Sequence, residues 1–150
     1  MIMDKNVEFC DAVAVTGASG NTAVVGNVVP LLPSDGDYAA SGRPLFFVAL
    51  VDTEIDSAGE ASTLQLHLMS DSTSNLTTSP TTHFSTGAIA EANLVAGALI
   101  CCVQMPQGKY EKYIGVKRTV GGEEITAGKI NAFLTPDPYP WIPMAANTGL

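Results

Sequence analysis

The chain has 150 residues, of which 46% are hydrophobic and 15% are charged, and its formal net charge is −8. A chain of this length and composition builds one domain with a real core and is not a disordered polymer. The excess of acidic groups makes nucleic acid and anionic membrane surfaces poor partners. The small charged fraction indicates a surface partly covered by other protein subunits, although acidity that serves only solubility is an alternative interpretation.

The N-terminal residues lack the apolar core of a signal peptide, and no apolar run approaches the roughly 20 residues that a membrane span requires. Synthesis in a cytoplasm is therefore the expectation. The three cysteines, Cys10, Cys101 and Cys102, agree with it, because an odd number does not make a disulfide framework. We expect them to be small buried apolar side chains.

Strand signals recur along the whole chain. Residues 44–52 form a continuous apolar run, which predicts a strand buried on both faces, whereas residues 63–69 alternate between apolar and polar. Only one short helical turn is expected, near residues 90–94. The eight predicted strands cover residues 9–15, 22–29, 44–52, 63–69, 82–89, 98–105, 110–120 and 124–134.

The connections between these strands are rich in Gly, Pro, Ser and Asp. Gly121 and Gly122 predict a β-hairpin between the last two strands, and residues 31–42 and 70–86 look like surface loops. Eight strands favour a single-domain, all-β, jelly-roll-like antiparallel β-sandwich over residues 9–134. An N-terminal arm, residues 1–8, and a C-terminal tail, residues 135–150, would extend from it.

The tail combines four prolines between positions 136 and 143 with Tyr139, Trp141 and Ile142. Proline favours an extended path outside a regular sheet, and aromatic side chains are typical interface anchors. The tail would therefore either fold back on its own sandwich or dock on a neighbouring subunit. Ile2 and Phe9, in and next to the N-terminal arm, are further candidates for the same role.

Residues that could carry chemistry are few. Two histidines, His67 and His83, do not make a cupin-type metal centre, and His67 is expected on the outer face of its strand. Asp52, Glu54 and Asp56 lack the order of an EF-hand loop and suit a solvated strand end better than a calcium site. The sequence thus predicts no catalytic residue, metal or cofactor, although a Ser-His-Asp constellation is not excluded.

Several short motifs resemble the small phage capsid cement (decoration) proteins of the Bbp16 type. The opening, MIMD followed by FCDAVAVT at residues 9–16, looks like the opening of that family, and GRPLFFV at residues 42–48 looks like its first long strand. GKYEKYIGV at 108–116, TVGG at 119–122 and TAGKI at 126–130 are similar to its closing hairpin. The Ser/Thr-rich loop at 70–86 and the Pro/Trp tail depart from the pattern.

This resemblance implies a jelly roll that assembles as dimers or trimers on the exterior of an icosahedral capsid. There it would bridge neighbouring copies of the major capsid protein and stabilise the virion head, and no catalytic residues come with the family. A glycan-binding jelly-roll module of a phage tail or fibre is the alternative from another class, because Trp and Tyr side chains permit sugar stacking. A jelly-roll enzyme is the third, and the lack of a histidine cluster argues against it.

Overall fold

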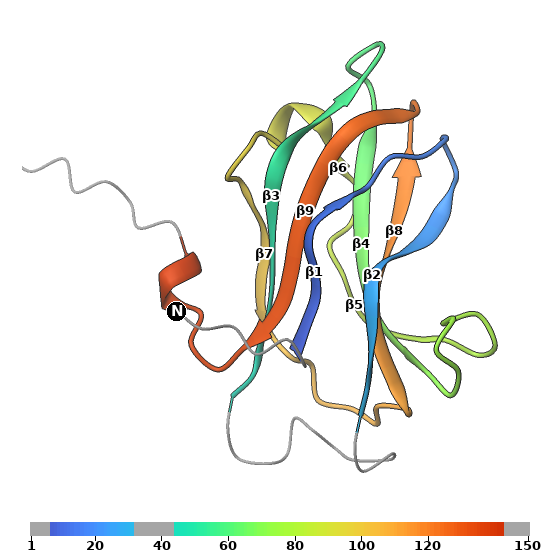
Figure 1. The fold of residues 1–150 in the computed structure, drawn as a ribbon, viewed down its shortest axis with the longest axis vertical. Coiled ribbons are helices and arrows are strands. Elements are labelled where there is room, and N and C mark those ends of the chain that lie inside the picture. The colour runs from blue at the N-terminus through green and yellow to red at the C-terminus, as the bar shows by residue number, and fades with distance from the viewer. Residues whose placement is uncertain (1–6, 32–43, 143–150) are drawn as a thin grey trace, which may run out of the picture.

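The computed structural model describes residues 7–31 and 44–142. Nine strands and two short 3₁₀ helices make up its regular structure, and Figure 1 shows them as two layers. The strands are β1 (Glu8–Ala14), β2 (Thr22–Pro30), β3 (Phe46–Ser57), β4 (Thr63–Asp71), β5 (Thr81–Ser85), β6 (Ile89–Ala90), β7 (Leu99–Gln104), β8 (Tyr113–Gly121) and β9 (Ile125–Thr135). The helices are η2 (Glu91–Asn93), where one helical turn was predicted, and η3 (Tyr139–Trp141).

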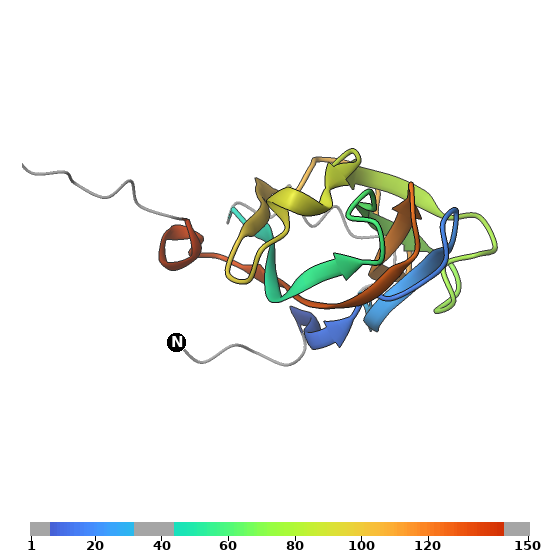
Figure 2. The same ribbon diagram turned by 90° about the horizontal axis from the view of Figure 1, so that it is seen from above.

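The strands form two antiparallel sheets, in the orders β1-β9-β3-β7 and β2-β8-β4-β5, with the short β6 beside β4. Strand pairs are nested along the chain: β1 pairs with β9, β2 with β8, β3 with β7 and β4 with β5. A long double ribbon wound around a core gives this arrangement, which is that of a jelly roll. The predicted β-sandwich is therefore confirmed, and its two sheets face each other in Figure 2.

The core lies between the sheets and comes from alternate residues of each strand. On β4, Leu64, Leu66 and Leu68 have no exposed surface, whereas the intervening Gln65 and His67 are half-buried on the outer side. Truncating one such leucine to alanine costs about 2–5 kcal/mol in stability. The period-two pattern of residues 63–69 thus places the core face of β4 correctly.

Arg118 is a polar exception on the core-facing side of β8. Its guanidinium donates hydrogen bonds to the carbonyl of Thr16, at 2.5 Å, and to Oδ1 of Asn21, at 3.1 Å. Gly17 makes room for it, because an added Cβ would stand 2.6 Å from Nη2. Burial lowers the pKa of Arg118, and the hydrogen bonds tie the loop between β1 and β2 to the second sheet.

The predicted hairpin at Gly121 and Gly122 is wrong. β8 pairs with β2 and β4, whereas β9 pairs with β1 and β3, so this turn carries the chain from one sheet to the other. Gly122 does adopt a positive φ of 71°, as expected, and an added Cβ would stand 2.2 Å from the carbonyl oxygen of Ala61. Gly122 therefore allows two turns to pack closely together and does not form a hairpin turn.

The Ser/Thr-rich segment, predicted to be a surface loop over residues 70–86, is only partly so. Its second part is β5, and within the loop Leu76 is fully buried. Gly115 provides the space for the Leu76 side chain, because an added Cβ at Gly115 would stand 2.8 Å from Leu76 and 3.1 Å from Val28. Lys117 also donates to the carbonyl of Leu76, at 2.7 Å. The loop therefore packs over the outer face of the second sheet.

The predicted loop at residues 31–42 lies outside the described residues except for Leu31, and so do residues 1–6 of the predicted N-terminal arm and residues 143–150 of the predicted C-terminal tail. Within the described part of the chain, no helix has the length and apolarity needed to cross a membrane.

Candidate protein-interaction surface

The C-terminal segment leaves β9 and turns at once. Thr135 Oγ1 accepts a hydrogen bond from the backbone N–H of Asp137, at 3.2 Å, and an Asp137 carboxylate oxygen accepts one from the N–H of Tyr139. Proline at 138 and 140 fits the first turn of η3, because its missing N–H has no partner there anyway. In Figures 1 and 2, η3 stands at the end of the molecule where β9 finishes.

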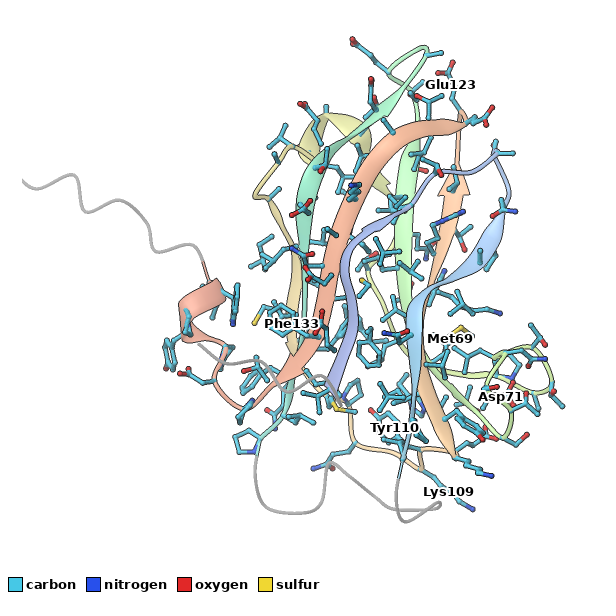
Figure 3. The ribbon with its side chains drawn as sticks, in the orientation of Figure 1. Met69, Asp71, Lys109, Tyr110, Glu123 and Phe133 are labelled. Carbon is cyan, nitrogen blue, oxygen red and sulfur yellow. The ribbon has the colours of Figure 1, made fainter. Side chains whose placement is uncertain are left out.

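Trp141 rests on its own domain. Its ring meets Phe133 of β9 edge-on, with the centroids 4.8 Å apart, and Phe133 is only 1% exposed. Phe133 is labelled in Figure 3. The indole Nε1 is buried but has no hydrogen-bond acceptor in the described structure. An unsatisfied buried donor costs about 1–3 kcal/mol, so the contact that holds Trp141 is an imperfect one.

Two neighbours of Trp141 are exposed to solvent: Tyr139 on η3 and Ile142 just after it. Tyr139 is 79% exposed and Ile142 is 41% exposed. They are two of three large, strongly exposed hydrophobic residues in the described chain, the third being Val95 at the opposite end of β7. Single exposed apolar residues are ordinary, but two beside a partly docked tryptophan make a local apolar patch.

A broader apolar surface adjoins this patch on the outer side of the first sheet. Phe47, Ala49 and Val51 of β3 point into the core, so the residues between them point outward. Val48 is fully buried there, opposite Phe133 on one neighbouring strand and Cys102 on the other. We call this surface the apolar face; its residues are Phe46, Val48, Leu50, Leu99, Cys102 and Phe133.

The apolar face explains the continuous apolar run of residues 44–52. The run was predicted to be buried on both sides, and its inner side is; on the outer side Phe46 and Leu50 are only half-buried. Sequence reasoning did not identify these residues as candidate interface residues. The signal was present, because a sheet with one solvated face alternates, whereas this strand does not.

The residues predicted as interface anchors lie in different places. Phe9 is wrong as an anchor, since its side chain is fully buried in the core, 6.1 Å from the ring of Phe47, and cannot reach another subunit. Ile2 lies outside the described residues. Tyr139, Trp141 and Ile142 do come together on η3 and just after it, and whether they touch a partner stays a prediction.

Two buried carboxylates hold other parts of the molecule together. Glu91, only 8% exposed, accepts hydrogen bonds from the hydroxyls of Ser57, at 2.5 Å, and Ser62, at 2.6 Å, and from their N–H groups. These bonds hold the pKa of Glu91 below its ordinary value although burial opposes them. The carboxylate thereby fixes η2 to the turn between β3 and β4.

Asp71 organises the loop that buries Leu76. Burial alone would raise its pKa, but its carboxylate accepts hydrogen bonds from the N–H groups of Thr78, Ser79 and Thr73 and from the Ser72 hydroxyl. Together these bonds lower the pKa of Asp71. This carboxylate, labelled in Figure 3, therefore holds the two ends of the loop together.

Ser70 and His83 form a serine–histidine pair, the arrangement that the sequence left open. Ser70 Oγ lies 2.7 Å from His83 Nε2 and accepts the N–H of Glu111, at 3.1 Å. The imidazole stacks on Tyr110, with the centroids 3.9 Å apart, and burial lowers its pKa. Ser70, however, has no exposed surface, so a substrate cannot reach its hydroxyl in this conformation. The pair fastens the loop before β8 to β4 and β5.

The three cysteine thiols are not activated, and the acidic residues of β3 belong to no metal-binding cluster of the described residues. Burial raises the pKa of Cys10 and of Cys101 to about 12 and raises that of Cys102, which is opposite to the shift of a reactive thiolate. Asp52, Glu54 and Asp56 lie exposed along β3. No group of three or more potential metal ligands occurs within residues 7–31 and 44–142.

The fold and its surface define a class: a small jelly roll with an exposed aromatic C-terminal patch beside a half-buried apolar face. The family model of Bbp16 matches residues 9–134, most of the chain, so the chain belongs to the Bbp16 family. That family name points to a phage-related structural protein. A search of curated proteins found no match.

Proposed function

We propose that this protein is a capsid cement protein, which binds the outer surface of a phage head and bridges neighbouring copies of the major capsid protein. Membership of the Bbp16 family supports a phage structural role. The observation that carries the finer proposal is the C-terminal patch, with Tyr139 79% exposed and Ile142 41% exposed beside the half-docked Trp141.

The architecture suits a rigid spacer with a binding end. The nested sheets and their core fix the shape of the domain, so little conformational freedom is lost when its surface docks. Proline at 136, 138 and 140 restricts the C-terminal segment in the same way. Aromatic anchors then contribute most of the binding energy at such an interface.

Bridging follows if the protein acts as an oligomer. A standard contact buries about 800 Å² per partner and is modest by itself, but a second contact made by the same oligomer is effectively intramolecular. A few moderate interfaces thus produce durable attachment across the boundary between two capsid subunits.

The glycan-binding alternative rests on Tyr139 more than on Trp141. A stacking site needs an exposed aromatic face, and the one tryptophan of the chain packs against Phe133, whereas Tyr139 is exposed. A glycan array that detects specific binding would restore this alternative.

Heads of the phage that encodes this protein, purified without it, provide the direct test. The added protein should sediment with the heads at a saturating ratio and raise the temperature at which they rupture. Protein that stays in the supernatant over heads known to be intact and expanded would overturn the proposal.

A further inference from the structure

A cleft of about 620 Å³ opens between β5 and the loop that precedes β8. The residues that line it are Thr81, His83, Gly108, Lys109 and Glu111. Its volume falls within the range of about 300–1,000 Å³ that is usual for small-molecule sites. Lys109 is labelled in the lower part of Figure 3, and no residue of the C-terminal patch lines the cleft. The cleft is therefore separate from the patch proposed to bind the capsid.

A β-bulge in β5 places His83 at this cleft. Phe84 and Thr82, on either side of His83, pair with two consecutive residues of β4. His83 is thus an extra residue in the strand, and such a bulge re-aims a side chain, often next to a functional site. The imidazole stacks on the buried ring of Tyr110 and also lines the cleft. Its position is therefore fixed from behind by the core.

Hydrogen bonds determine which imidazole nitrogen carries the proton. Ser70 Oγ accepts the N–H of Glu111 and lies 2.7 Å from His83 Nε2. Because Ser70 is fully buried, its hydroxyl hydrogen finds its acceptor in Nε2. Burial lowers the pKa of His83 although Glu111 opposes the shift, so the ring is neutral and carries its proton on Nδ1.

This Nδ1–H is a free donor on the cleft. Nδ1 lies on the side of Gly108, where an added Cβ would stand 3.8 Å from it. Within the described part of the chain, no acceptor bonds to it. The absence of a side chain at Gly108 leaves the space in front of this donor open.

Lys109 and Glu111 bring opposite charges to the same cleft. Glu111 Oε1 accepts the hydroxyl of Thr81, at 3.1 Å. Lys109 forms no ion pair with Glu111 or with any other described residue. The cleft therefore offers one carboxylate that accepts hydrogen bonds and two groups that donate them, the ammonium and the Nδ1–H, and its lining has no net charge.

This combination selects a neutral ligand rich in hydroxyl groups. A simple ion would be attracted by one of the two charges and repelled by the other. A zwitterion would suit both charges, but its own two charges lose hydration on entering. A hydroxyl group both donates and accepts, so neighbouring hydroxyls of a sugar ring satisfy all three groups together. We propose that this cleft binds a saccharide unit, with Glu111 as the acceptor and Lys109 and His83 as the donors.

The capsid role and this site are independent. Attachment through the first sheet and the C-terminal patch would leave a cleft beside β5 open to solvent. Both a free sugar and the end of a glycan chain would then reach it. The shared chemistry is the sugar ring, and the experiments separate the two sources.

Titration of the isotope-labelled full-length chain with free sugars gives the first test. Among glucose, galactose, mannose and N-acetylglucosamine, at least one should shift the amide signals of Gly108 and Glu111 and the imidazole signals of His83. Glycine, a zwitterion, should leave these signals in place. The proposal is overturned if no sugar of this panel shifts them, or if glycine shifts them more than every sugar does.

Two variants test the assignment of residues with the sugar that binds. Glu111→Ala should bind about tenfold more weakly or worse, because it removes a charged acceptor. Glu124→Ala, which changes an exposed carboxylate outside the cleft, is the matched control and should bind like the wild type. Gly108→Leu should fill the cleft without disturbing the fold, because an added Cβ there meets only His83 Nδ1 within 4 Å. Wild-type affinity in either cleft variant, with thermal unfolding unchanged, would contradict the site.

A glycan array separates the sources of the sugar. An array signal that Glu111→Ala abolishes shows that the cleft takes the end of a glycan chain, whereas a blank array beside a positive titration shows that it takes free sugars. A signal that Tyr139→Ser abolishes and Glu111→Ala keeps would place sugar binding at the C-terminal patch and overturn the cleft. Glu111→Ala should bind phage heads like the wild type, so failure of the capsid role and failure of this site are distinguishable.

Discussion

Glu91 and Asp71 are the carboxylates on which the pH dependence of stability should depend. Hydrogen bonds hold the pKa of each below its ordinary value, 4.5 for Glu91 and 3.8 for Asp71. The unfolded chain therefore takes up protons before the folded one does. Stability is fully present above these ordinary values and is lost as the pH falls through the lower pKa values of the folded state.

Glu91→Gln should be less stable than the wild type at neutral pH, because the serine hydroxyls lose a charged acceptor. It should also lose less stability on acidification. Urea unfolding at a series of pH values measures both, and Glu124→Gln, an exposed residue with the same change in charge, is the control. Identical acid slopes for Glu91→Gln and the wild type would contradict the role given to this carboxylate.

The turn between β8 and β9 allows a prediction at the scale of the element. Gly122→Ala combines a positive φ with a collision against the Ala61 carbonyl, so it should destabilise the fold by more than about 1 kcal/mol. Gly20→Ala has a similar φ of 79° with nothing within 4 Å of an added Cβ. Thermal unfolding should show the larger loss for Gly122→Ala, and equal losses would mean that the close approach of the two turns is unimportant.

The loop after β4 gives another prediction at the same scale. Leu76→Ala removes the side chain that the loop buries against Gly115 and Val28, and should cost about 2–5 kcal/mol. Thr77→Ala, its exposed neighbour, should cost far less. Denaturant unfolding measures the difference. Similar, small effects at both positions would show that the loop is not anchored.

Strand periodicity explains why most of the fold could be predicted. Alternation at residues 63–69 and the two-sided apolar run at 44–52 are local signals, and both led to the correct strands. Which strands pair is not local: the Gly121-Gly122 turn looks like a hairpin, and only the rest of the fold shows that it crosses between sheets. The position of Phe9 was missed for a similar reason, because an apolar residue near a chain end looks the same whether it enters a core or a partner.

The molecule as a whole has two chemically different sides. The second sheet is covered by the loop anchored through Leu76 and by polar contacts such as His67 with Thr119. The first sheet carries the apolar face and, at one end, the C-terminal patch. This asymmetry predicts that the protein meets its partner with the first sheet and the patch, and leaves the second sheet in solvent.

Binding of a patch variant to undecorated heads tests this most directly. Tyr139→Ser/Ile142→Ser changes two exposed side chains and leaves the core intact, whereas Val95→Ser changes an exposed apolar residue at the other end of the domain. The double variant should bind at least about tenfold more weakly, since each lost anchor costs about 1 kcal/mol or more, and Val95→Ser should bind like the wild type. Wild-type affinity in the double variant would contradict attachment through the C-terminal patch.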